Sequence, residues 1–192
     1  MSRNYVIPIK LPLGMFLTPD QAATRGRLNI SFPLMGILDP ERMRELLAQV
    51  LGSQGWKELD GKWERTSPDL GLWRIDPATT TLEVDISRRL PQTVSVSPDA
   101  LSHPPDPEFG DPTPQDIRPE IRRILEANIA GLEEKTKDDL VADAVRARQA
   151  LSEALRDVYR QALQEKARSL GNVVSVSESA QDGTMRIRIE IA

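Results

Sequence analysis

The sequence predicts an α+β protein. Three observations carry this prediction: short alternating apolar stretches before residue 97, apolar residues at helical spacing between residues 114 and 170, and an alternating final segment. The chain has 192 residues, which is room for one domain or two small ones. We expect a sheet region over 1–97, a proline-rich acidic linker over 98–113, and a helical hairpin with a terminal β-hairpin over 114–192, as separate parts or as one cooperative domain.

The first region combines strands with one helix. Residues 5–11 form a candidate strand at a sheet edge because Pro8 lacks an amide donor, and a second strand runs from Leu28 to Phe32 with alternate residues on a buried face. Asp39 and Pro40 mark a helix start, with the aspartate as the cap and the proline at the first helical position. The apolar residues that follow at helical spacing, and that we expect to pack on a sheet, are Met43, Leu46, Leu47, Val50 and Leu51.

A meander of strands follows this helix. Asp60-Gly61 separates the candidate strands 56–59 and 62–65, and it is a strong hairpin signal because both turn positions favour positive φ. The remaining candidate strands run over 72–75, over 82–86 and through Val94 and Val96. All three tryptophans lie in this meander; we expect them in the core of the sheet, with a recognition surface as the alternative: Trp56, Trp63 and Trp73.

The stretch between Ser97 and Gln115 separates the two halves of the chain. Its prolines exclude a regular helix or a central strand: Pro98, Pro104, Pro105, Pro107, Pro112 and Pro114. We interpret it as an extended linker or a surface loop, and a polyproline-type ligand for the aromatic groove of a partner is the alternative.

The second half is helical. One helix has apolar residues between Ile117 and Leu132, a break is expected at Gly131 and the charged run 133–139, and a second helix spans about 138–170. A helix of about 33 residues extends roughly 50 Å, which is longer than a compact domain needs. It therefore pairs with the preceding helix or projects towards a partner. Four residues of its apolar stripe form the candidate interaction face: Leu151, Leu155, Val158 and Ala162.

The chain ends in a predicted β-hairpin. Val174 and Val176 alternate with serines, Gln181-Asp182-Gly183 forms the turn, and apolar residues alternate with charged ones from Met185 to Ile191. A two-stranded hairpin is only marginally stable alone, so we expect it to dock on the helices or to extend the N-terminal sheet.

This last segment carries a resemblance. Residues 162–167, Gly171, Ser177 to Gly183 and Met185 to Ile191 resemble the ending of a bacterial and plastid family of uncharacterised small proteins, over roughly the last 35 residues. Such relatives resemble accessory components of systems encoded with FtsH-like AAA+ ATPases. The resemblance implies an accessory role and supplies no catalytic or binding residue.

Several enzyme classes are excluded or disfavoured. The chain has no cysteine, which excludes thiol catalysis and disulfides, and its single histidine, His103, lies between serine and proline as in a loop. Neither a phosphate-binding loop nor a nucleophile elbow is present. The carboxylates at 133–134, at 138–139 and at Asp143 are interpreted as solvated and helix-capping rather than as a metal or acid–base site, so we expect no cofactor and no metal.

Charge and hydropathy limit the partners. The formal net charge is −4, and the arginine pairs 25/27, 88/89 and 122/123 form no continuous stripe, so we expect no binding to nucleic acid. No apolar run reaches the roughly 18 residues of a membrane span, and the N-terminus lacks the apolar core of a secretory signal. A cytoplasmic protein without membrane insertion is the expectation.

The sequence therefore favours a non-enzymatic accessory subunit of a bacterial multi-protein assembly linked to an AAA+ ATPase. Its expected partners are proteins, either such an ATPase or further copies of this chain. The alternative is a small-ligand-binding protein or a hydrolytic enzyme whose site uses dispersed Asp, Glu and Arg residues.

Overall fold

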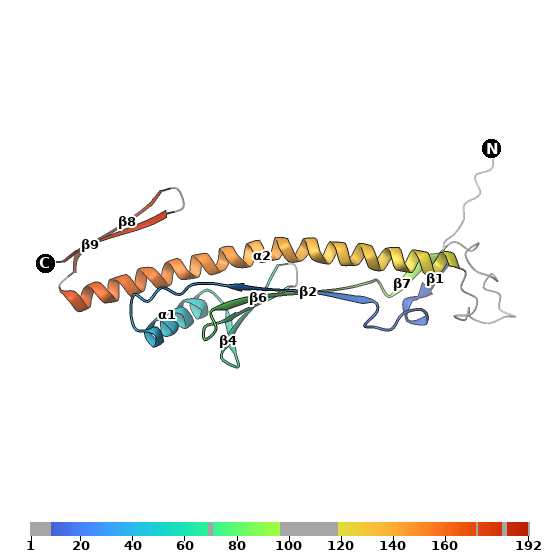
Figure 1. The fold of residues 1–192 in the computed structure, drawn as a ribbon, viewed down its shortest axis with the longest axis horizontal. Helices are drawn as coiled ribbons and strands as arrows, with labels where there is room; N and C mark the ends of the chain where they lie inside the picture. The colour runs from blue at the N-terminus through green and yellow to red at the C-terminus, as the bar shows by residue number, and fades with distance from the viewer. Residues whose placement is uncertain (1–8, 69–70, 97–118, 172, 182–183, 192) are drawn as a thin grey trace. The chain divides into compact units, whose positions relative to one another are not determined.

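The computed structural model describes residues 9–68, 71–96, 119–171, 173–181 and 184–191. It contains strands and two α-helices, so the predicted α+β class is confirmed. The elements, drawn in Figure 1, are β1 (Ile9–Pro12), a 3₁₀ turn (Leu13–Met15), β2 (Ala23–Ser31), α1 (Pro40–Ser53), β3 (Lys57–Leu59), β4 (Lys62–Thr66), β5 (Leu72–Asp76), β6 (Thr81–Arg89), β7 (Thr93–Val96), α2 (Pro119–Leu170), β8 (Val173–Gln181) and β9 (Thr184–Ile191).

The chain divides into two compact units. One combines residues 1–26 with 86–139, and the other combines residues 27–85 with 140–192. The strands β2 and β6 and the helix α2 each contribute residues to both units. The predicted linker over 98–113 lies outside the described residues, so the domain boundaries that we placed there stay predictions.

A five-stranded antiparallel sheet has the order β2-β6-β5-β4-β3. The predicted hairpin between β3 and β4 is confirmed, because Asp60 and Gly61 both have positive φ angles of 51° and 75°. The second strand begins at Ala23, five residues before the predicted start. Leu28 was expected on a buried face but is 39% exposed. As the outermost strand of this sheet, β2 has a neighbouring strand on one side only, and this leaves Leu28 less covered.

The unit of residues 27–85 and 140–192 contains the larger core. The five residues predicted to form the apolar stripe of α1 are all buried. Trp56 and Trp73 are buried and Trp63 is partly buried against the same cluster, so these tryptophans belong to the core as expected. The cluster joins α1, the strands β5 and β6, and α2; its buried members are Phe32, Met43, Leu46, Leu47, Val50, Leu51, Trp56, Trp73, Ile75, Leu82, Val84, Ala144, Ala147, Leu151, Ala154, Val158 and Ala162.

Pro40 is the first residue of α1, as predicted, but Asp39 does not cap the helix with its side chain. Asp39 instead accepts the first intrahelical bond through its backbone, from the amide of Met43 at 2.9 Å. The helix ends two residues before Gly55, whose φ of 83° suits glycine.

The unit of residues 1–26 and 86–139 has its own small core. Strands β1 and β7 pair antiparallel, which confirms the strand predicted through Val94 and Val96. The side chains of Leu13, Ile121 and Leu125 form the buried cluster of this unit. The hydroxyls of Thr24 and Thr136 lie 2.6 Å apart, and the Thr136 hydroxyl also donates to the carbonyl of Leu132 at 2.7 Å.

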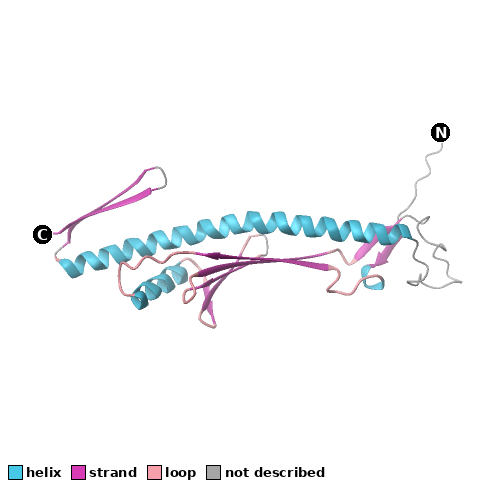
Figure 2. Ribbon diagram, in the orientation of Figure 1, coloured by secondary structure: helices cyan, strands magenta, loops and turns pink. Residues whose placement is uncertain are grey.

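The predicted helical hairpin is wrong, because α2 is one unbroken helix of 52 residues (Figure 2). Gly131 costs only about 1 kcal/mol in a helix interior, and no proline follows Pro119 to stop the helix. The charged run 133–139 contains glutamates and lysines, which are good helix formers, and Glu133 precedes Lys137 at the favourable spacing of four. Charge and one glycine therefore do not end this helix. Its end at Leu170 agrees with the predicted end of the second helix.

The buried residues of α2 recur every 11 positions. Leu125, Thr136, Ala147 and Val158 are all buried at this spacing. In a second series with the same spacing, Ile121, Asp143 and Ala154 are buried and Leu132 is half-buried. Eleven residues correspond to about 3.67 residues per turn, close to the 3.6 of a straight helix. Within each unit the helix can thereby keep its buried residues on one face. Leu170, the last residue of the helix, is 70% exposed.

The terminal hairpin is confirmed as β8 paired antiparallel with β9. The two strands form a two-stranded sheet of their own rather than an extension of the five-stranded sheet. The residues Asp182 and Gly183 of the predicted turn lie outside the described residues.

Candidate functional site

The structure places the predicted interaction face in the core. Leu151, Val158 and Ala162 are between 0% and 3% exposed, and Leu155 is partly buried against the same cluster. Side chains of α1 and of the sheet belong to this cluster and pack against the predicted face. The preceding helix that we expected as its partner is not a separate element, because residues 119–132 are part of α2 itself. The chain itself covers these four side chains, so they do not form an exposed docking face.

Asp143 is a buried carboxylate in the centre of this core. Its side chain has no exposed surface, and its Oδ2 accepts a hydrogen bond of 2.8 Å from the indole Nε1 of Trp73. Its Oδ1 lies 3.6 Å from the guanidinium of Arg146 and accepts no hydrogen bond in the described part of the chain. The interpretation of Asp143 as a solvated, helix-capping residue was wrong, since the unbroken α2 offers no helix start for it to cap.

Trp73 links Asp143 to an aromatic pair. The ring centroids of Trp56 and Trp73 lie 6.1 Å apart and the ring planes are tilted by 40°. The guanidinium of Arg65 lies 5.9 Å from one centroid and 6.0 Å from the other, a cation–π distance for both rings. The indole Nε1 of Trp56 is buried and has no hydrogen-bond partner in the described part.

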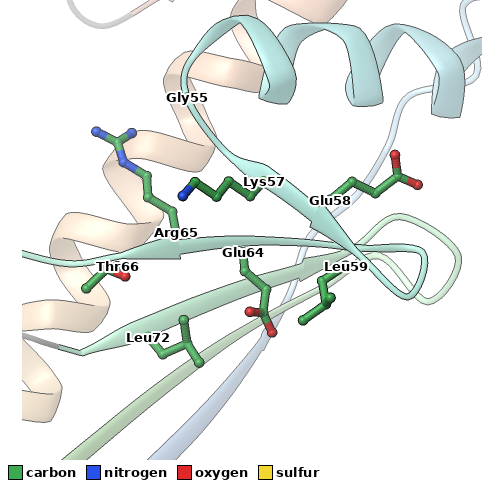
Figure 3. A pocket seen from close by; sticks show the side chains of 8 residues that line it. All are labelled: Gly55, Lys57, Glu58, Leu59, Glu64, Arg65, Thr66 and Leu72. Atoms are coloured by element: carbon green, nitrogen blue, oxygen red, sulfur yellow. The ribbon is translucent and has the colours of Figure 1, made fainter.

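A hollow of about 530 Å³ lies at the β3 edge of the five-stranded sheet. Figure 3 shows Glu64 and Leu72 on one side of the sheet and Arg65 on the other. The register agrees, because Arg65 is opposite Trp73 on the core face while Glu64 is opposite Arg74 on the outer face. The residues that line the hollow are Gly55, Lys57, Glu58, Leu59, Glu64, Arg65, Thr66 and Leu72.

An ion-pair network covers the outer face of the sheet, centred on Arg74. Its guanidinium binds Glu64 at 2.5 Å and Glu83 at 3.1 Å, and Arg27 binds Asp85 at 3.2 Å beside them. The hydrogen bond that Arg74 donates to Glu64 raises the pKa of Arg74; burial lowers this pKa, and the hydrogen bond that Arg74 donates to Glu83 raises it further. The guanidinium of Arg74 therefore compensates the negative charge of Glu64, and Glu64 does not act as a free carboxylate in the hollow.

A second ion pair joins α1 to the C-terminal part of α2. Arg42 donates from Nε and Nη2 to Glu165, both at 2.9 Å, and also binds Glu45 at 2.8 Å. The hydrogen bond from Arg42 lowers the pKa of Glu165, and the hydrogen bond to Glu165 raises the pKa of Arg42. The Tyr159 hydroxyl of α2 donates to the carbonyl of Pro33 at 2.9 Å.

The other candidates from the sequence do not assemble into a site. Asp139 binds Arg88 at 3.1 Å, so this member of the carboxylate run has a structural partner. Within the described ranges no three or more His, Asp or Glu side chains gather as ligands of a metal ion would. His103 lies outside the described residues.

Sequence reasoning missed the burial of Asp143 and did not single out Arg65. A signal for Asp143 was present, because it stands 22 residues after the buried Ile121 and 11 residues before the buried Ala154 on α2. A charged residue in such a series predicts a buried polar contact. The approach of Arg65 to two tryptophans depends on the strand register, which the sequence does not specify.

Comparison with known protein families identifies a family for this chain. A family model described as FtsH ternary system domain X5 matches residues 1–191, so the resemblance extends well beyond the last 35 or so residues where we had placed it. No curated protein and no solved structure is significantly similar to the chain. In the part of the chain that the structure describes, neither helix combines the length and the apolar character that a membrane span requires. The chain belongs to the FtsH ternary system domain X5 family.

Proposed function

We propose that this chain is a non-enzymatic accessory subunit of a bacterial multi-protein assembly, and that the assembly contains an FtsH-type AAA+ ATPase as its direct partner. The observation that carries the proposal is the family match over residues 1–191. It includes residues of both compact units, so the accessory role belongs to the whole chain.

The use of charged groups supports a non-enzymatic role. A hydrolytic or acid–base site needs carboxylates and arginines that are free to meet a substrate. In the described part, Arg42 binds Glu165 and Arg74 binds Glu64, and these ion pairs stabilise the fold. Asp143 accepts a hydrogen bond from a core tryptophan and is closed to solvent. These groups favour a scaffold over a reaction centre.

The test is reconstitution of the complex from purified components. The full chain and the FtsH-type ATPase proposed as its partner are mixed, and size-exclusion chromatography with light scattering measures the mass of the complex. We expect a complex of defined stoichiometry, and an FtsH-type ATPase from outside the system is the control that should not bind. If the two cognate proteins, both folded, elute separately at micromolar concentrations, the proposed direct partner is wrong.

One observation favours the alternative of a small-ligand-binding protein. The hollow at the β3 edge has a volume of about 530 Å³, within the usual range of ligand sites, and Lys57 and Arg65 offer two cations to an anionic ligand. Native mass spectrometry of the purified chain tests this alternative. A bound anion that is retained by the native chain and lost from Lys57→Met would favour it, whereas the accessory role predicts the unliganded mass for both proteins.

A further inference from the structure

The end of β4 has a neighbouring strand on one side only. β3 pairs with β4 as far as Lys57, which is opposite Glu64, whereas β4 continues to Thr66 and stays paired with β5 on its other side. Of the described strands, only β3 lies on this side of β4. Successive residues of a strand direct their backbone N–H and C=O groups to opposite sides. Either Arg65 or Thr66 therefore directs both of its backbone groups into the place beside β4 where β3 has ended.

The hollow of about 530 Å³ lies at this place. Gly55 and Lys57 line it from the β3 side, and Arg65 and Thr66 line it from the end of β4. Because the hollow is a gap in the edge of the sheet, its lining side chains lie on both sides of the sheet, as Figure 3 shows. We call this hollow the β4 notch. It offers a ligand open backbone groups as well as side chains.

Two cationic side chains in the β4 notch have no carboxylate partner. Neither Lys57 nor Arg65 forms an ion pair with another described residue. Figure 3 shows the Lys57 side chain extending toward Arg65, while the carboxylate of Glu58 points the other way. The remaining carboxylate of the notch, that of Glu64, is compensated by Arg74. The charge left at Lys57 and Arg65 therefore attracts a negatively charged ligand.

The other side of the β4 notch carries apolar groups. Leu72 lines the notch and is half-buried, and Leu59 lines it and is 55% exposed. Figure 3 shows both leucines on the side of the sheet opposite to Arg65. The side chains of an extended peptide alternate between the two faces of a sheet. A peptide with carboxylates on one face and apolar side chains on the other therefore matches both sides of the notch.

We propose that the β4 notch binds a short extended segment of a protein partner in which acidic residues alternate with apolar ones. The segment adds to the sheet beside Arg65 and Thr66 and forms hydrogen bonds with the open backbone groups. Its carboxylates face Lys57 and Arg65, and its apolar side chains face the two leucines. A small anion would use the cations but leave the backbone groups and the apolar side without contacts. This inference rests on the proposed accessory role, because that role requires a protein partner.

Arg65 provides a signal that reports on the site itself. Its guanidinium lies 5.9 Å from the ring centroid of Trp56 and 6.0 Å from that of Trp73. A carboxylate that binds this guanidinium changes the electric field at both rings. The tryptophan emission of the chain should therefore change when the acidic segment binds.

The test uses the full chain and a short capped peptide of alternating glutamate and valine. Fluorescence anisotropy of a dye on the peptide measures its affinity, and the tryptophan emission is followed in parallel. Lys57→Glu should weaken binding about tenfold, because charge reversal replaces an attraction by a repulsion. Lys57→Arg keeps the charge and should bind as the native chain does. A peptide with N-methylated amides keeps its carboxylates but lacks N–H donors, so the native chain should bind it about tenfold more weakly.

The matched control is Lys166→Glu, which reverses an exposed lysine charge on α2 outside the β4 notch and should leave the affinity unchanged. Circular dichroism and the thermal midpoint check that the variants fold, as expected for an exposed Lys57. The proposal is overturned if the native chain does not bind the peptide even at millimolar concentrations, or if folded Lys57→Glu binds it equally well.

The N-methylated peptide tests the native chain and does not depend on the folding of any variant. If it binds as tightly as the unmodified peptide, strand addition is wrong and the notch is a site for anions alone. The ATPase is absent from these measurements. A failure of peptide binding is therefore distinct from a failure of the ATPase complex to form.

Discussion

Replacing Asp143 with alanine tests whether the hydrogen bond from Trp73 stabilises the fold. The change removes the acceptor at 2.8 Å and leaves the indole Nε1 of Trp73 without this hydrogen bond. Trp73 is only 4% exposed, so water does not replace the lost acceptor. An unsatisfied buried donor costs about 1–3 kcal/mol. For a chain of 192 residues each kcal/mol shifts the thermal midpoint by about 2–4 °C. A loss of about 2 kcal/mol therefore lowers the midpoint by roughly 4–8 °C.

The assay is thermal and urea unfolding of Asp143→Ala beside two controls. Asp143→Asn keeps a carbonyl oxygen that can accept the bond, so it should lose less stability. Val141→Ala changes a side chain that is 64% exposed and should be nearly neutral. Trp73→Phe in combination with Asp143→Ala completes a double-mutant cycle, and we expect a coupling of about 0.5–3 kcal/mol. Unchanged midpoints for Asp143→Ala, or a coupling near zero, would refute the reasoning.

Three further outcomes are expected. Leu151→Ala should cost about 2–5 kcal/mol in urea unfolding because Leu151 is buried, whereas Arg156→Ala, at an exposed position of the same helix, should be nearly neutral; equal effects would contradict the placement of α2. Since Arg42 lowers the pKa of Glu165, their pair stabilises the fold above the ordinary glutamate pKa and this contribution is lost as the pH falls through the lowered value. The stability of Glu165→Gln should consequently depend less on pH over that acidic range, and identical pH profiles would exclude the effect. Gly61→Ala should lower the midpoint, because a residue with a side chain at a φ of 75° costs about 1–2 kcal/mol; an unchanged midpoint would argue against the turn geometry.

Local signals in the sequence predicted the elements that depend on local physics. The five apolar residues of α1 recur at helical spacing, and all five are buried. Asp60-Gly61 specified a two-residue turn, and the structure has positive φ at both positions. Such features could be read directly because spacing and backbone preference act within a few residues.

The errors arose where long-range packing decides. Gly131 and the charged run after it were read as a break, but the penalty of one glycine is small beside the packing along α2. The apolar stripe at Leu151 and Val158 was read as a docking face or a helix pair, yet α1 and the sheet supply its partners. Asp143 was read as solvated because nothing local reveals that Trp73 lies beside it.

The 11-residue spacing in α2 restricts how the length of this helix can change. Each inserted or deleted residue rotates everything after it by about 100° and moves it by about 1.5 Å. A single deletion between Ala147 and Val158 would therefore turn Val158 away from the face that Ala147 occupies in the larger core. A block of 11 residues restores that orientation and lengthens the helix by about 16 Å. We therefore expect the length of α2 to differ among family members by multiples of 11 residues.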